Sequence, residues 1–317
     1  MPRTLLVGDW PVSLIDRGAG PPLVFLHGAT QDRSVWSRQI KYFQASHRTI
    51  AFDMRGHGQT PLGPTIENGE TVLSLDALGR DCLAIMDKLR VERAVLCGVS
   101  LGGMVALDVA ARAPERVEAL VLANTPLALS LSPRVLTVID WLNPYTVLVP
   151  LLRWVEPERV AKIGTRIARV VFGPGWARGE GTRRFVRAFG RMKPKALIET
   201  YRAICEARLP QLSRITCPIL VVTGHDEANM IFRHAAEIAR GVGTAELATI
   251  PGGHVSNLDS PDAFNRTLDA FFVRWLHQPS ALLPVPSVLS PNTSPSDATG
   301  PAPRSTAKAS TGSIRPS

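Results

Sequence analysis

The sequence predicts an α/β protein with a mostly parallel central sheet that is covered by helices on both faces. Short, continuously apolar runs alternate along the chain with longer stretches of helical periodicity. Strands that are apolar at every position are buried on both faces, which is typical of parallel sheets covered by helices. The chain has 317 residues, of which 45% are hydrophobic, and is long enough for one large domain or two ordinary ones.

The predicted strands are apolar runs, most of which lead into loops that contain glycine. In chain order they span 22–28, 49–58, 93–100, 117–125, 218–224 and 245–254. The stretches between them that show helical periodicity span 75–91, 102–115, 228–240 and 260–276. Ser260 is a suitable N-cap for the last of these helices, and Pro261 occupies its first turn.

Residues 126–212 interrupt this alternation, because they are helical in pattern and lie between two predicted strands. We therefore expect a core made of residues 1–125 and 213–277, with 126–212 inserted as a helical cap. Residues 278–317 are rich in Pro, Ser, Thr and Ala and lack periodic apolar content. We expect this tail to be disordered, since it has little apolar surface with which to offset the entropy of ordering.

The net charge of +9 is concentrated in the predicted insert. Residues 127–208 hold fifteen Lys and Arg against six acidic residues, which accounts for the whole excess. No nucleic-acid-binding motif accompanies these charges, so we expect no nucleic-acid partner. The apolar stretch 135–155 is interrupted by Asp, Asn, Pro and Arg, and this argues against stable insertion into a membrane.

The cysteines and the first residues of the chain predict a location. The sequence has no CxxC pair and no regular cysteine spacing, so neither a disulfide framework nor a zinc site is expected. The opening MPRTLLVGDW lacks the apolar core of a signal peptide. We therefore expect a cytoplasmic protein.

A serine stands among glycines in the stretch VLCGVSLGGM, residues 95–104. Gly98, Ser100 and Gly102 match the pattern G-x-S-x-G, in which a sharp turn between a strand and a helix exposes the serine hydroxyl. An ordinary tight turn would explain these five letters equally well. However, a predicted strand precedes the pattern and a predicted helix follows it, which is the context that a nucleophile elbow requires.

Together with this motif, several segments make the chain resemble the α/β-hydrolase family. They occur in the order of the family and are FLHGA (25–29), DMRGHG (53–58), GVSLGG (98–103), LVLANT (120–125), VVTGHDE (221–227) and IPGGHVSNLDSPDAFN (250–265). The resemblance covers about residues 10–277 apart from the insert. It is strongest to the branch of esterases, lactonases and cofactor-free haloperoxidases. It implies a serine nucleophile and implies no metal or organic cofactor.

The resemblance also implies a base and an acid for Ser100. His254 follows the last predicted strand and is the expected base, while His225 is a weaker alternative. The acid is expected three residues past the glycine that ends strand 218–224, which is Glu227. Asp226 lies one residue earlier and has the commoner chemistry for this role, so both carboxylates stay open, with Glu227 preferred.

Two backbone N–H groups are expected to form an oxyanion hole. One belongs to Leu101, which follows the nucleophile, and the other to Ala29, which follows the HG pair of the first motif. Gly28 is expected to keep the backbone open to the substrate. We expect His27 and His57, which lie in the HG and RGHG loops, to brace those turns instead of taking part in the reaction.

The cap is expected to supply an apolar roof for the substrate. Within it, residues 135–155 form a broken amphipathic stretch, from which Trp141 and Leu142 are the proposed substrate-binding side chains. The expected substrate is therefore a small molecule with an apolar part. The sequence does not address the oligomeric state.

These expectations combine into a serine hydrolase that cleaves a carboxylic ester, thioester or lactone through an acyl-enzyme on Ser100. One alternative is a carbon–carbon bond hydrolase or cofactor-free perhydrolase with the same triad. Another is a ligand-binding protein on a hydrolase scaffold. A serine at the elbow argues against epoxide hydrolase chemistry, since the family uses Asp at that position in epoxide hydrolases.

Overall fold

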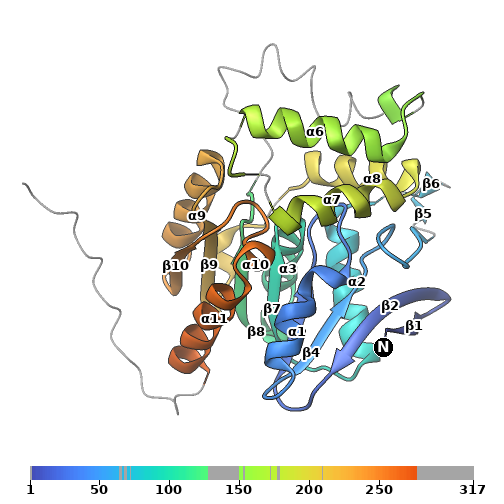
Figure 1. Cartoon of the computed structure of the whole chain (residues 1–317). Coiled ribbons are helices and arrows are strands. Elements are labelled where there is room, and N and C mark those ends of the chain that lie inside the picture. The colour runs from blue at the N-terminus through green and yellow to red at the C-terminus, as the bar shows by residue number, and fades with distance from the viewer. Residues whose placement is uncertain are drawn as a thin grey trace, which may run out of the picture. The chain divides into compact units, whose positions relative to one another are not determined.

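An eight-stranded sheet forms the centre of the structure, which is a computed structural model (Figure 1). The residues that it describes are 2–63, 66–67, 70–71, 73–127, 150–152, 154–171, 173–176, 179–208 and 210–276. Trp141, Leu142 and the tail 278–317 therefore lie outside the described residues, as does most of the stretch 135–155.

The strands of this sheet lie in the order β1-β2-β4-β3-β7-β8-β9-β10. All neighbours from β4 to β10 are parallel, and β1 and β2 pair antiparallel at one edge. The bounds are β1 (Arg3–Val7), β2 (Trp10–Arg17), β3 (Pro22–Leu26), β4 (Arg48–Phe52), β7 (Ala94–Val99), β8 (Val117–Ala123), β9 (Ile219–Gly224) and β10 (Ala245–Ile250). A separate short hairpin pairs β5 (Ile66–Glu67) with β6 (Glu70–Thr71). The predicted mostly parallel sheet is confirmed.

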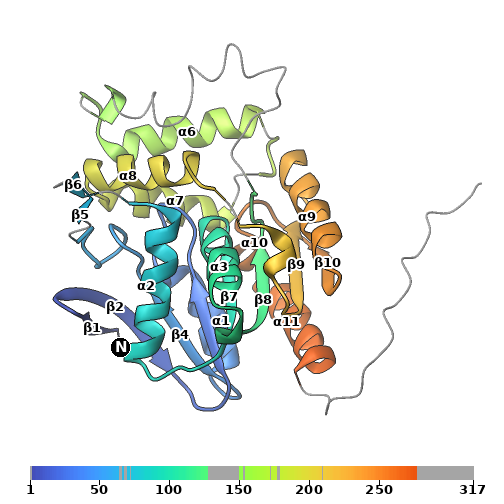
Figure 2. The ribbon, with the colours of Figure 1, turned by 180° about the vertical axis from the view of Figure 1, so that it is seen from behind.

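Helices cover both faces of the sheet, as the two opposite views show (Figures 1 and 2). On one face lie α1 (Ser37–Phe43), α10 (Ser256–Asp259) and α11 (Pro261–Trp275). On the other lie α2 (Leu75–Lys88), α3 (Leu101–Arg112) and α9 (Asn229–Gly241). Within the described ranges, short turns of 3₁₀-helix span Arg33–Trp36, Pro114–Arg116 and Leu212–Arg214.

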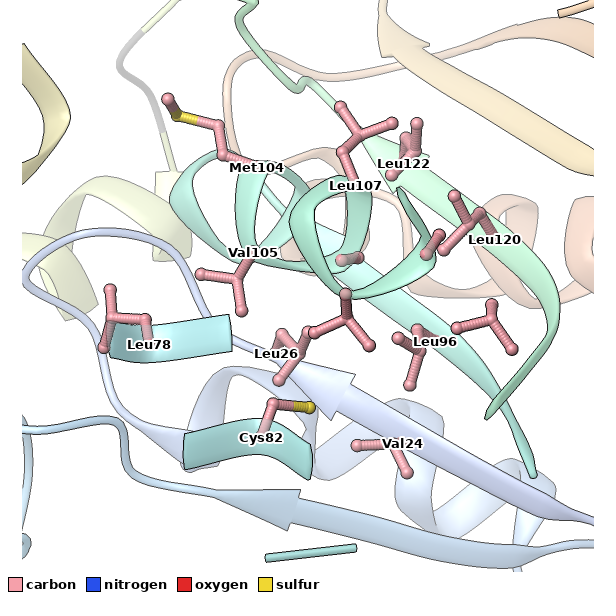
Figure 3. Packing of buried hydrophobic residues seen from close by; sticks show 14 of the residues in the cluster. Val24, Leu26, Leu78, Cys82, Leu96, Met104, Val105, Leu107, Leu120 and Leu122 are labelled. Carbon is pink, nitrogen blue, oxygen red and sulfur yellow. The ribbon is translucent and has the colours of Figure 1, made fainter. Parts of the chain in front are cut away.

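The strands serve both layers because successive side chains point to opposite faces of a sheet. In β3, Val24 and Leu26 pack with α2 and α3, as the close view of this cluster shows (Figure 3). The intervening Leu23 and Phe25 pack with α1 and α11. Each central strand thus needs apolar residues throughout, and the continuous runs in the sequence reflect that need.

The N-terminal strands β1 and β2 are not predicted by the sequence patterns. Within β2, Trp10, Val12 and Leu14 are buried at alternate positions, whereas on the other side Ser13 is buried and Pro11 and Ile15 are only partly buried. Such a half-buried strand at a sheet edge has a period of two instead of a continuous apolar run. Its signal is short and is interrupted by Pro11, whose ring cannot donate to a ladder.

Three cap helices lie over the carboxyl ends of the parallel strands: α6 (Pro157–Val171), α7 (Gly179–Arg191) and α8 (Pro194–Cys205) (Figure 1). They have a small core of their own, which includes Leu152, Val160, Phe189 and Leu197. The predicted helical insert is therefore present in the fold. Its limits, 126–212, stay a prediction, because 128–149 lie outside the described residues.

Among the helices that the structure describes, none is long and apolar enough to cross a membrane.

Candidate active site

Ser100 lies in a sharp turn between β7 and α3. Its backbone has φ +54° and ψ −117°, a region that residues with a side chain rarely occupy. The glycines around it are needed for space. A Cβ at Gly98 would lie 2.3 Å from the backbone of Gly102, and a Cβ at Gly102 would lie 2.1 Å from the carbonyl oxygen of Leu26. The turn therefore has the build of a nucleophile elbow, with the hydroxyl at the carboxyl end of the sheet.

His254 lies in the loop between β10 and α10, and its ring reaches Ser100. The distance from His254 Nε2 to Ser100 Oγ is 3.1 Å, although the two residues are 154 positions apart in the chain. The opposite ring nitrogen, Nδ1, lies 2.8 Å from Glu227 Oε2. Because an ionised carboxylate only accepts, Nδ1 carries the proton and Nε2 is left to accept from the serine hydroxyl.

The two neighbouring carboxylates lie in different surroundings. The side chain of Glu227 is fully buried, and its Oε1 accepts from the backbone N–H of Ala228 at 2.8 Å. The side chain of Asp226 is 46% exposed, and its Oδ1 lies 3.4 Å from Nδ1 of His225, which is itself 80% exposed. The structure therefore brings Glu227 to His254, and it places Asp226 and His225 together at the surface.

The pKa of His254 reflects this pairing. Burial lowers it, but the charge of the Glu227 carboxylate and the hydrogen bond to it have a larger combined effect, so the pKa lies above the usual value. An imidazole with a raised pKa is a stronger base and holds a proton more readily during a reaction. The arrangement can thus remove the proton from Ser100 and return it to a leaving group.

Ala29 and Leu101 both line the cavity that Ser100 opens into. Leu101 is the first residue of α3, where a backbone N–H has no partner within the helix. In the part of the chain that is described, no hydrogen bond is found for either N–H group. The N–H of Gly28 is occupied, since it donates to Gln31 Oε1 at 3.0 Å. Two unoccupied donors beside a serine can hold a negatively charged oxygen.

Asn124 follows β8 and connects the loops of the acid and the base. It is fully buried, and its Oδ1 accepts from the backbone N–H of Gly224 at 2.8 Å. Its Nδ2 donates to the carbonyl of His254 at 3.0 Å and to Ser256 Oγ at 2.9 Å. The sequence patterns do not point to Asn124 as part of the site. The available signal is an asparagine at the end of a strand, where its positive φ of 46° is tolerated better than in most residues.

His27 and His57 lie together, and His27 joins the HG loop to the RGHG loop. Their ring centroids are 4.9 Å apart, and both side chains are fully buried. His27 Nε2 accepts from the backbone N–H of Met54 at 3.0 Å, and its Nδ1 lies 2.8 Å from the carbonyl of Gly28. Burial lowers the pKa of His27 to about 4 and that of His57 to about 3. Both rings are therefore neutral near pH 7.

The cavity beside Ser100 has a volume of about 290 Å³ and mostly apolar walls. The core contributes residues such as Met104 and Ile231, and Gly28 also lies in its wall. The cap helices contribute Thr165, Thr182, Phe185, Tyr201 and Ile204. The predicted pocket residues Trp141 and Leu142 fall outside the described residues. Of the described end of 135–155, Leu152 packs inside the cap and Trp154 is 88% exposed.

Several known proteins are similar to this chain over most of its length. A 3-oxoadipate enol-lactonase of Acinetobacter baylyi is 28% identical over 262 residues, covering 80% of this chain and 90% of the relative. A crystal structure of a hydrolase from Pseudomonas aeruginosa superimposes with a TM-score of 0.71 at 26% identity, covering 86% of this chain and 98% of the other. The enol-lactonase from Burkholderia xenovorans has the same fold, with a TM-score of 0.71, 23% identity, and coverage of 86% and 100%.

A family model also matches most of the chain. Residues 23–267 match the model described as the alpha/beta hydrolase family, and this range includes the elbow, both loops of the candidate site and the cap helices. The chain belongs to the alpha/beta hydrolase family.

Proposed function

We propose that this enzyme cleaves a carboxylic ester, thioester or lactone by means of Ser100, His254 and Glu227. The observation that carries the proposal is the chain of hydrogen bonds from Ser100 Oγ through the imidazole of His254 to the buried carboxylate of Glu227. This series of hydrogen bonds starts at the strained elbow of Ser100 and faces an apolar cavity. A nucleophile, a base and an orienting acid in this arrangement are the parts needed for acyl transfer.

In the proposed reaction, His254 Nε2 takes the proton from Ser100 Oγ as the oxygen attacks the carbonyl carbon of the substrate. The N–H groups of Ala29 and Leu101 hold the oxygen that becomes negatively charged. The protonated imidazole, stabilised by Glu227, then gives its proton to the leaving oxygen or sulfur, and an acyl-enzyme remains. His254 next activates a water molecule, which releases the acid and restores the serine.

The proposed substrate is a small molecule with an apolar acyl part. The walls of the cavity support this, since burial of apolar substrate surface is favourable there. The enol-lactonase relative supports a lactone as one form of the ester.

The proposed location is the cytoplasm. The thiols of Cys82, Cys97 and Cys217 are in no disulfide, which supports this location.

A substrate panel tests the proposal. Purified protein is assayed with p-nitrophenyl acyl esters, neutral lactones, acyl thioesters and vinylogous diketones, each beside Ser100→Ala. We expect hydrolysis of at least one ester, thioester or lactone series, which the folded Ser100→Ala variant lacks. Turnover restricted to the diketones would favour a carbon–carbon bond hydrolase. Binding of these compounds without turnover by the wild type would favour a ligand-binding protein.

A further inference from the structure

Trp176 belongs to the cap, yet it contacts both the base and the acid of the proposed triad. It lies in the turn between α6 and α7. Its indole ring stacks on the imidazole of His254, with centroids 5.0 Å apart and 28° between the planes. Its Nε1 donates to Glu227 Oε1 at 2.5 Å, and its carbonyl oxygen accepts from the backbone N–H of His254 at 3.2 Å. One residue therefore makes three separate contacts with the two partners of Ser100.

The contact with Glu227 completes the surroundings of a buried charge. A carboxylate without exposure to water is costly unless its oxygens accept hydrogen bonds. Oε2 of Glu227 is used by His254, while Oε1 accepts from the backbone of Ala228 and from the indole of Trp176. The two oxygens thus have separate tasks. The indole N–H shares the charge of the carboxylate and fixes the plane of the carboxyl group.

The contact with His254 holds the ring that must change its charge. The nearly parallel indole leaves the imidazole in the plane from which Nε2 reaches Ser100 Oγ at 3.1 Å. When the imidazole takes up the serine proton, the face of an indole beside it attracts the cation. The other carboxylates near this loop have their own partners: Asp226 lies beside His225, and Asp259 accepts from the N–H of Gly253.

We propose that Trp176 is a positioning residue through which the cap completes the catalytic machinery. The indole holds the carboxylate of Glu227 and the ring of His254 in their working arrangement. The triad is therefore fully assembled only while the turn that carries Trp176 is seated on the histidine loop. This inference rests on the proposed function of Ser100, His254 and Glu227.

The turn that carries Trp176 packs tightly against the neighbouring loops. A substitution at a glycine in this contact can therefore displace the turn without removing the indole. A Cβ added at Gly175 would lie 2.5 Å from the side chain of Asp226, and a Cβ added at Gly253 would lie 2.5 Å from the carbonyl oxygen of Trp176. Neither distance is compatible with the present position. Gly175→Ala is therefore expected to lift the turn, and with it the indole, away from Glu227.

The main test is Trp176→Phe, which keeps a ring for stacking and removes the N–H. Activity is measured on the best substrate of the panel, and nucleophile reactivity is measured as the rate of labelling by a fluorophosphonate. We expect kcat and the labelling rate to fall roughly 10- to 100-fold, the range for losing one hydrogen bond to a buried charge. KM should change less than kcat, because the contact serves the triad and not the bound acyl group.

A pH profile separates positioning from simple packing. Without the indole donor, more of the carboxylate charge is left to hold a protonated His254. The acidic limb of kcat/KM should therefore move to higher pH in Trp176→Phe. Trp154→Phe is the matched control, since Trp154 is also in the cap but is 88% exposed, and both its rate and its pH profile should equal those of the wild type.

Gly175→Ala provides a second approach to the same contact if Trp176→Phe folds poorly. It should lower kcat and the labelling rate, and the double variant should lose less than the product of the two single effects, because both act through one contact. Unchanged kcat and an unmoved acidic limb in Trp176→Phe, or a loss of rate without movement of the limb to higher pH, would overturn the inference. Ser100→Ala is measured beside it, since full activity of that variant would instead refute the proposed function.

Discussion

The core and the cap helices contribute to the active site in opposite ways. The core supplies the polar groups of the proposed reaction, on loops that follow the carboxyl ends of β7, β9 and β10. The cap supplies mostly apolar side chains to the cavity, such as Phe185, Tyr201 and Ile204. In the proposed function, the core therefore determines which bond is broken, and the cap contributes to the selection of the molecule that carries it. Trp176 is a cap residue that contacts both His254 and Glu227 of the core.

The largest expected effect falls on the core. His254→Ala and Ser100→Ala should each lower kcat by roughly 10⁴–10⁶-fold, because the members of a triad act as a unit. The double variant should lose no more than either single one. Rates are measured in single turnovers at saturating substrate, with circular dichroism to show that the variants fold. Multiplicative losses would mean that the two residues act in separate steps and not as a pair.

The next effect separates the two adjacent carboxylates. Glu227→Gln should lower kcat by roughly 10³–10⁴-fold, since an amide at this place can donate to Nδ1 of His254 and so favours the tautomer whose Nε2 cannot accept from Ser100. Asp226→Asn is the matched control, and its kcat should stay close to that of the wild type because its side chain lies beside His225. A disabled Asp226→Asn with a nearly normal Glu227→Gln would show that the wrong neighbour has been assigned to the base.

A third effect concerns the stability of the core. His27 and His57 stay neutral in the folded protein down to a pH of about 4 and about 3, whereas the unfolded chain takes up protons below its usual pKa of 6.5. The free energy of unfolding should therefore fall as the pH falls from about 6.5 towards 4. Each of the two residues contributes a slope of about 1.4 kcal/mol per pH unit.

The contribution of His254 to the pH dependence of the free energy of unfolding has the opposite sign. Because its folded pKa is raised, its contribution to the free energy of unfolding is present below the unfolded pKa and is lost as the pH rises through the folded value.

Urea unfolding of the wild type and of His57→Gln at several pH values between 7 and 4.5 measures how the free energy of unfolding depends on pH with and without His57. His57→Gln should show a smaller loss of stability with acid. Equal slopes for the two proteins would contradict the account of a neutral, buried His57.

The smallest effect falls on the cap. Each methylene buried in the cavity contributes up to about 0.8 kcal/mol, so kcat/KM for neutral esters should rise a few-fold per acyl carbon until the cavity is full. Phe185→Ala enlarges the cap side of the cavity and should move the preferred chain to a greater length. Trp154→Ala, on the exposed surface, is the control. A flat profile in the wild type would remove the apolar-pocket claim.

The difference between the core and the cap also explains which features could be predicted from the sequence. The strands, the elbow and the loop of His254 have local signals, because burial on two faces and close backbone contacts restrict the residue types near them. For the acid, the resemblance to the family offers only an offset that favours Glu227, and the residue types of the adjacent Asp226 and Glu227 do not show which side chain the fold directs to His254. Asn124 is similar, because its bonds to Gly224 and His254 join segments that are 100 and 130 positions away.

The cap was the least predictable part of the site. Trp176 contacts Glu227 across 51 positions, and nothing in its neighbourhood distinguishes it from the other tryptophans. The cavity walls come from α6, α7 and α8 at positions set by how the helices pack, whereas the sequence favours the more apolar stretch 135–155. Apolar content predicts that side chains are buried, but it does not distinguish the lining of a cavity from the interior of the cap.

In the proposed reaction, Ser100 is a nucleophile that His254 activates. The most direct measurement is to treat the protein with a fluorophosphonate, digest it, and locate the label by mass spectrometry. We expect one label, on the peptide that contains Ser100. We also expect a labelling rate that rises with pH as His254 loses its proton, and no labelling of the folded Ser100→Ala variant. Label on another residue, or labelling that persists in folded Ser100→Ala, would contradict it.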